Sequence, residues 1–245
     1  MRAILFGLTI LSFTGFSQGD SLSSARQTSA FDNMHFYLTG LVAVPSPQLS
    51  KAVNNDWSNL GVGLSSGILF NPFGQKQASP VLLGVDFSYI TFGVDKIAKT
   101  PFSPPLKTTF NVYSINANAR WLLGQRTGFA PFVDGMVGIK IFNTRTKIDK
   151  DLLDTVLGTD QPEVINTTND TGLNYGLGIG FFNRKERGVN SANGSFTFRV
   201  LYVWGADAKY VVRDSITLDA NNYVHYETGY TKTDMILVQL GFVLY

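Results

Sequence analysis

The feature that most constrains this chain is the alternation of side chains in its final segment, residues 235–245. Gln239 and Gly241 lie between large apolar residues that occupy every second position, namely Ile236, Val238, Leu240, Phe242 and Leu244. Successive side chains of an extended strand point to opposite sides. The segment therefore predicts a strand with one wholly apolar face, which must be covered by a protein core or by lipid.

Seven earlier segments repeat this alternation, and no helical periodicity stands out between them. Together they predict an all-β chain of eight strands. The predicted strands are residues 35–44, 60–70, 81–92, 110–123, 131–144, 173–182, 195–209 and 235–245.

The face opposite the bulky residues is small and polar in most of these segments. In the sixth segment it reads Asn174, Gly176, Gly178 and Gly180. A soluble sandwich would carry bulky charged residues on its outer face, with glycine depleted. A small face instead suits the lumen of an eight-stranded barrel, which is just wide enough for side chains. The pattern predicts an eight-stranded antiparallel up-and-down transmembrane β-barrel, because only alternate residues of such strands touch lipid.

The connections between the predicted strands also alternate in length. The first, third, fifth and seventh are long, and the second, fourth and sixth are shorter. Bacterial barrels have short periplasmic turns, longer extracellular loops and an even number of strands. The pattern therefore predicts that both termini are periplasmic and that residues 145–172 and 210–234 form large outer loops.

The N-terminus has the features of a secretory signal peptide. Arg2 precedes an apolar run that ends at Phe13, and the small residues Gly15 and Ser17 follow. We assign residues 1–18 to a signal peptide, 19–33 to a flexible periplasmic leader and 34–245 to the barrel. A transmembrane anchor is the alternative, although the apolar run is short for a helix that spans a bilayer.

Composition excludes several other classes of protein. The chain has no cysteine, which leaves no disulfide, thiolate metal site or acylated cysteine anchor. Its formal charge of +2 is too small and too dispersed to indicate a nucleic-acid partner.

Taken together, these segments resemble small eight-stranded outer-membrane barrels of the OmpA, OmpX and OmpW types. The glycine-rich, asparagine-containing strands are most similar to the PorT-like barrels of Bacteroidota, and the resemblance of pattern covers residues 34–245. It implies the outer membrane of a Gram-negative bacterium, contact with outer-membrane lipid and lipopolysaccharide, and assembly by the outer-membrane insertion machinery. The C-terminal assembly signal would comprise Leu240, Phe242, Leu244 and Tyr245, although Tyr245 is out of register with the apolar face.

Isolated charges on the inward faces form the candidate site, which comprises Asp86, Arg120, Asp134, Lys140 and Arg199. Buried charges must be paired and hydrogen-bonded, or each costs several kcal/mol. We therefore predict an internal salt-bridge network that plugs the barrel. A shift in register that moves some of these charges into loops is one alternative, and a gated pore is another.

The sequence predicts no catalytic, cofactor or metal site. Its two histidines are His35 and His225, and although Glu227 shares a face with His225, no serine stands two positions away as a partner. Carboxylates in one outer loop lack the fixed spacing of a calcium loop, namely Asp149, Asp151, Asp154 and Asp160. The charged run 184–187 falls in a predicted periplasmic turn.

These observations favour a non-enzymatic structural or interaction protein. The likeness to PorT-like barrels implies an accessory role in secretion within a larger envelope complex. Two alternatives stay open: a barrel of the OmpW type that transports small molecules, and an outer-membrane enzyme that modifies lipid.

Overall fold

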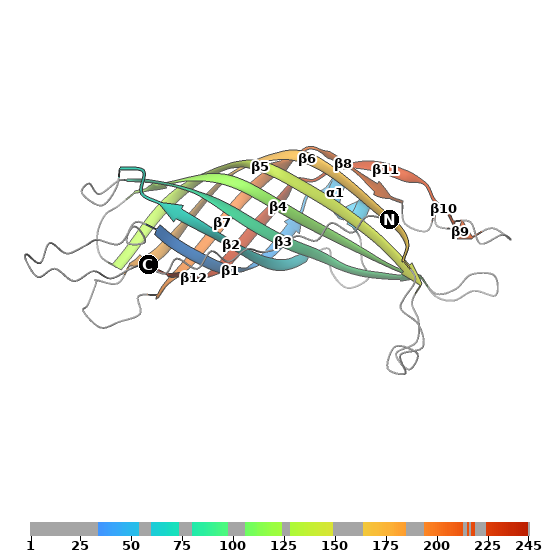
Figure 1. The fold of residues 1–245 in the computed structure, drawn as a ribbon, viewed down its shortest axis with the longest axis horizontal. Coiled ribbons are helices and arrows are strands. Elements are labelled where there is room, and N and C mark those ends of the chain that lie inside the picture. Colours follow the sequence, from blue (N-terminus) through green and yellow to red (C-terminus); the bar gives the residue numbers. More distant parts are fainter. Residues whose placement is uncertain are drawn as a thin grey trace, which may run out of the picture.

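The computed structural model shows a closed barrel whose strands run obliquely along its length (Figure 1). It describes residues 34–53, 60–73, 80–97, 106–123, 128–148, 164–184, 194–212, 215, 217–218 and 224–244. The predicted signal peptide and leader, the carboxylates of residues 149–160 and Tyr245 lie outside these ranges.

Eight antiparallel strands close the barrel, in the order β1-β12-β7-β6-β5-β4-β3-β2. This confirms the predicted all-β barrel of eight antiparallel strands. β1 begins and β12 ends at the same end of the barrel, here called the terminus end, and the opposite end is called the loop end. The strands are β1 (Met34–Pro45), β2 (Gly61–Phe70), β3 (Val81–Ile97), β4 (Leu106–Leu122), β5 (Gly128–Ile148), β6 (Val164–Arg184), β7 (Gly194–Gly205) and β12 (Met235–Leu244).

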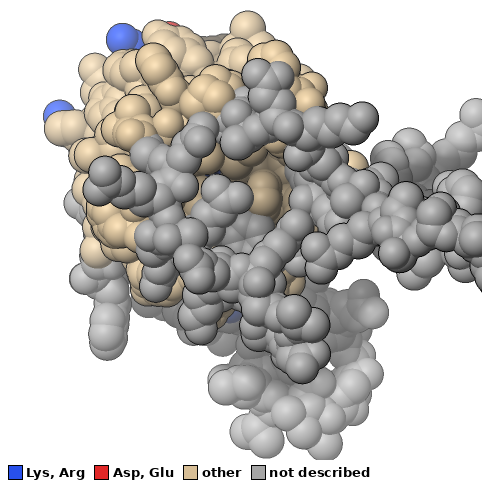
Figure 2. Space-filling model, turned by 90° about the vertical axis from the view of Figure 1, so that its left-hand side faces the viewer, with Lys and Arg blue, Asp and Glu red and all other residues tan. Residues whose placement is uncertain are grey.

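The bulky face of every barrel strand points outward, as the alternation predicts. Ile115 is 62% exposed, Leu173 71% and Ile179 66%, whereas their strand neighbours Asn116 and Asn174 are buried. Among the described residues, the outward positions carry no Asp, Glu, Lys or Arg until β4 and β5 pass Asn111 and Asn143. Figure 2, which views the terminus end, likewise shows few charged side chains on the described surface. We call this uncharged outer surface the apolar belt.

Four strands are longer than the alternation alone indicates. Pairing of β4 with β5 continues to Leu106 and Ile148, and pairing of β3 with β4 continues to Ile97. Part of the chain that was predicted to form long loops therefore belongs to strands. The connection between β3 and β4, for example, comprises only residues 98–105. The bulge between Thr91 and Val94 shifts the alternation there, and Gly93 adopts the positive φ of 92° that glycine tolerates best.

The predicted seventh strand is interrupted. β7 stops at Gly205, and β8 (Asp207–Val211) leaves the barrel to pair with β11 (Thr228–Lys232). The interruption reverses the expected faces: Asp207 was predicted to share the inward face of Arg199 but is exposed, and Ala208 is buried instead. Beyond this hairpin, β9 (Thr217–Leu218) pairs with β10 (Val224–His225).

One helix, α1 (Pro47–Val53), corrects the expectation that the chain has no helical segment. Ser46 caps it by accepting a hydrogen bond from the Leu49 amide at 3.3 Å, and Pro47 occupies its first position. Leu49, Ala52 and Val53 follow the spacing of one helical face and are buried at the loop end. The helix is too short for its periodicity to stand out in the sequence. Among the described residues, no helix has the length and apolarity required to cross a membrane.

The sequence predicts a small and polar lumen, but the barrel interior also contains two clusters of large apolar side chains. One apolar cluster fills the terminus end, and a larger one that includes residues of α1 fills the loop end. A layer of polar and charged side chains lies between them. The terminus cluster comprises Tyr37, Leu69, Leu82, Leu122, Ala130, Phe132, Phe182 and Val243. The loop-end cluster includes Leu41, Leu49, Ile90, Phe92, Phe110, Val112, Phe142, Leu201, Val203, Met235 and Leu237.

Candidate functional site

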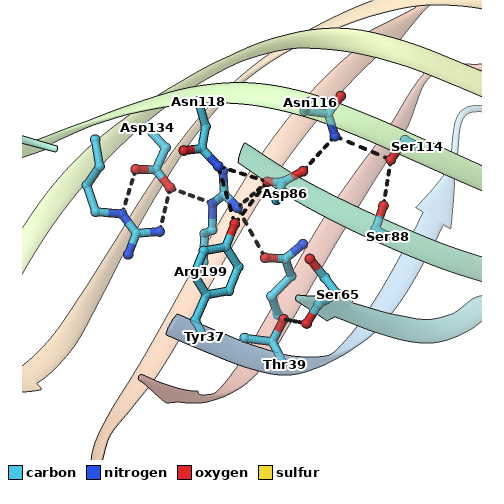
Figure 3. Close-up of polar contacts among 12 residues, drawn as sticks. Tyr37, Thr39, Ser65, Asp86, Ser88, Ser114, Asn116, Asn118, Asp134 and Arg199 are labelled. Carbon is cyan, nitrogen blue, oxygen red and sulfur yellow. Dashed lines mark hydrogen bonds and ion pairs between the residues drawn. The ribbon is translucent and has the colours of Figure 1, made fainter. Parts of the chain in front are cut away.

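The polar layer is organised around the buried carboxylate of Asp86 on β3 (Figure 3). Asn116 on β4 donates a hydrogen bond to its Oδ1 at 2.8 Å, and Asn118 donates to its Oδ2 at 3.1 Å. The hydroxyl of Tyr37 on β1 also donates to Oδ2, at 3.2 Å, and accepts a bond from Asn118. Several donors share its two oxygens, so protein groups compensate the charge of Asp86.

The second carboxylate of this layer belongs to Asp134 on β5. Arg120, directly opposite on β4, donates Nε and Nη2 to the two oxygens of Asp134 at 2.8 and 2.9 Å. This paired geometry is the strongest form of contact between arginine and a carboxylate. The Arg120 guanidinium also lies 3.7 Å from the centre of the Phe132 ring, which packs it against the terminus cluster.

Arg199 on β7 connects the two carboxylates across the lumen. Its Nε lies 2.5 Å from Oδ2 of Asp134, and its Nη1 donates to Oδ2 of Asp86 at 3.4 Å. β7 and β3 are not neighbours in the barrel, so this side chain spans the interior (Figure 3). Gln239 on β12 accepts a further bond from Nη1 at 3.4 Å. The two arginines balance the two aspartates, and we call these four side chains with Tyr37, Asn116, Asn118 and Gln239 the luminal cluster.

Lys140, the fifth candidate charge, lies apart from the luminal cluster. It is buried on β5 towards the loop end, and its Nζ donates to the carbonyl of Thr233 at 2.7 Å. That carbonyl lies just before β12 begins, so Lys140 holds the chain where it re-enters the barrel. The structure thus brings together Asp86, Arg120, Asp134 and Arg199 and gives Lys140 a separate partner.

Four members of the luminal cluster were not among the candidate charges, namely Tyr37, Asn116, Asn118 and Gln239. The signal that identifies them was present, since each lies on the inward face of its strand. What the sequence could not give is the stagger of the strands, which brings Tyr37 opposite Gly67 and level with Asp86.

Gly67 gives a specific test of this arrangement. A Cβ there would lie 2.5 Å from the Tyr37 hydroxyl and 2.6 Å from the Val85 carbonyl. We expect Gly67→Ala to displace the Tyr37 ring and to lower the free energy of unfolding by about 1–3 kcal/mol, as overpacking does. Urea titration of the refolded barrel measures this. Gly40→Ala is the matched control, because its Cβ would meet nothing nearer than the Leu240 carbonyl at 3.9 Å. Equal losses in the two variants would contradict the close fit.

The His225 and Glu227 pair lies outside the barrel, and both residues are exposed. The fold brings Ser215 to this region, but the Ser215 hydroxyl donates to the carbonyl of Val212 and accepts from the amide of Glu227. It is therefore engaged by the backbone. Within the described ranges, no group of His, Asp and Glu side chains has the arrangement of a metal site.

Three of the four C-terminal residues proposed as an assembly signal occupy the outer face of β12, and the fourth, Tyr245, lies outside the described residues. Leu240, Phe242 and Leu244 are all more than half exposed and belong to the apolar belt. Phe242 meets Phe196 of β7 edge to face, with ring centres 6.5 Å apart.

The fold and the luminal cluster define a small eight-stranded barrel with a filled interior. Two solved structures of bacterial proteins are similar to it in fold. The attachment invasion locus protein Ail of Yersinia pestis, solved in complex with the heparin analogue sucrose octasulfate, matches with a TM-score of 0.42 and 10% identity, covering 86% of this chain and 96% of Ail. The N-terminal β-barrel domain of Pseudomonas aeruginosa OprF matches with a TM-score of 0.40 and 12% identity, covering 85% and 96%. No family model and no curated protein matches the chain.

Proposed function

We propose that this protein spans the outer membrane of a Gram-negative bacterium as a sealed, non-enzymatic barrel with a structural or interaction role. The apolar belt is the observation that carries the proposal. It surrounds the barrel with exposed residues such as Leu64, Ile115 and Leu177, each about 60% exposed. Monomeric soluble proteins rarely leave apolar patches larger than a few hundred Å² open to water. A closed barrel in lipid satisfies both its backbone and this surface.

Membrane extraction tests the proposal directly. We expect the processed protein to stay with outer membranes after alkaline washing, to dissolve only in detergent, and to migrate faster on gels before boiling than after. These properties follow from a lipid-covered belt on a barrel without free edges. A compact monomer that dissolves in buffer without detergent would refute the proposal.

The filled interior supports a closed barrel in preference to transport. Apolar clusters block both ends of the lumen, and the luminal cluster fills the layer between them. We therefore expect vesicles that contain the reconstituted protein to swell no faster in small sugars than empty vesicles do, because eight strands leave little room for water. Measurable flux would favour the alternative of a transport barrel of the OmpW type.

Outer surfaces are the part of such a protein that is free to engage partners. Beyond the belt, β3 to β6 and the β8–β11 hairpin extend at the loop end (Figure 1). Tyr230 of β11 is 71% exposed. We propose that this end interacts with other envelope components, and that the likeness to PorT-like barrels reflects an accessory role in a larger complex. Purification from native outer membranes in mild detergent tests this, and recovery of the barrel alone would count against it.

A further inference from the structure

The outward side chains change from apolar to polar where β3 to β6 extend beyond the other strands of the barrel. β2 pairs with β3 no further than Thr91, and β7 pairs with β6 no further than Asn174, yet β4 and β5 remain paired to Leu106 and Ile148. A four-stranded extension therefore stands at the loop end on one side of the molecule (Figure 1).

Successive rows of outward residues on this extension pass from aromatic to amide to basic. Tyr89 and Tyr113 pack together first, with ring centres 5.1 Å apart. Asn111, Asn143 and Asn169 form the next row and are joined by side-chain hydrogen bonds, Asn111 to Asn143 at 3.5 Å and Asn143 to Asn169 at 2.5 Å. Aromatic side chains are enriched where a barrel leaves the hydrocarbon and enters the headgroups, so the amide row lies on the headgroup side of that boundary.

Basic residues occupy the rows above. Arg145 is exposed and lies opposite Thr109, and Lys147 lies opposite Lys107 on the same outer face, since the intervening Thr108 and Thr146 are buried. Lys96 holds the register position on β3 that faces Lys107. We call Lys107, Arg145 and Lys147 the basic rim.

This arrangement is unfavourable unless an anion offsets it. Like charges directly opposite each other on neighbouring strands are destabilising. The ion pairs that the structure gives for the described residues lie inside the barrel, at Arg120 and Arg199, and none reaches the basic rim. Uncharged residues of many types can occupy exposed positions on a strand. The presence of Lys or Arg at all three positions of the basic rim therefore indicates a negatively charged ligand.

We propose that the basic rim binds the phosphate groups of lipid headgroups in the surrounding leaflet. Arg145 is level with Thr109, four residues beyond Tyr113. At about 3.4 Å per residue and a strand tilt of about 40°, it stands about 10 Å above the tyrosines. Long basic side chains reach back towards the membrane from this height, and both lysine and arginine bind phosphate well. This inference rests on the proposed membrane insertion.

The experiment compares two variants that lose the same number of positive charges. In the triple variant K107Q/R145Q/K147Q the basic rim is neutral, and the control K51Q/K209Q/K232Q removes three lysines from α1, β8 and β11. Each protein is folded into phosphatidylcholine vesicles that contain diphosphoryl lipid A or the same lipid without phosphates. The midpoint of urea unfolding is measured against the amount of lipid A.

We expect phosphorylated lipid A to stabilise the wild-type protein and the control, and to act on the rim variant only at about tenfold higher amounts, a loss of about 1.4 kcal/mol in binding. Equal stabilisation of all three proteins, or equal effects of the phosphate-free lipid, would overturn the proposal. So would an equal effect of inorganic phosphate or a soluble polysulfate at matched phosphate or sulfate concentration. Failure of the wild-type protein to fold into any vesicle would instead refute the proposed membrane insertion, so the two failures are distinguishable.

Discussion

Replacing Asp134 with asparagine is expected to lower the free energy of unfolding by about 3–5 kcal/mol, because removal of one partner leaves buried charges uncompensated. Asp134 is 1% exposed and holds Arg120 through two hydrogen bonds and Arg199 at 2.5 Å. The variant would leave two buried guanidiniums with the single carboxylate of Asp86. Urea titration in lipid vesicles, with intrinsic tryptophan fluorescence as the signal, measures the loss.

Two further variants separate charge balance from other effects of the substitution. Asp207→Asn makes the same chemical change at an exposed aspartate and should alter stability by less than about 0.5 kcal/mol. Adding Arg199→Gln to Asp134→Asn restores equal numbers of positive and negative charges within the luminal cluster, so the double variant should be more stable than the sum of the two single losses indicates. If Asp134→Asn and Asp207→Asn behaved alike, the luminal cluster would contribute nothing to stability.

The alternation of side chains is sufficient to predict the strands and their outer faces. A period of two is set by the backbone itself, so Ile115 and Asn116 must point to opposite sides wherever the strand lies. The same alternation does not separate a polar lumen from an apolar one, because Leu82 and Ile90 share the inward face of Asp86. The apolar clusters that fill the two ends of the barrel could therefore be identified only from the structure.

Two features account for the other differences between the predicted and the observed structure: a local interruption of one strand, and the stagger of the strands relative to one another. The break at Ala206 reverses the faces at the end of the predicted seventh strand, which is why Asp207 was misplaced. The contacts of Arg199 with Asp86 depend on how far each strand slides past its neighbours, and period-two alternation leaves that stagger undetermined. Inward charges could be identified one strand at a time, but their partners across the lumen could not.

Replacing Ile115 with arginine should separate a membrane barrel from a soluble one. Ile115 lies near the middle of β4 and is 62% exposed, so the change disturbs no interior packing. In a bilayer, arginine on the lipid face near the midplane is expected to cost about 2–4 kcal/mol. In water, the same change would add a charge to an exposed apolar site and would leave stability unchanged or raise solubility.

Thr109→Arg is the matched control for this prediction, because it adds the same side chain to the same face of β4. Thr109 lies beyond the aromatic and asparagine rows, level with Arg145. Near the interface the cost of arginine falls to about 0–1 kcal/mol. Unfolding measured in vesicles should therefore show a larger loss at residue 115 than at residue 109. Arg145 lies directly opposite residue 109, so repulsion between the two arginines adds a cost at that position only and works against the expected difference. Because a soluble barrel has no depth axis, equal effects at the two positions would show that lipid does not cover the apolar belt.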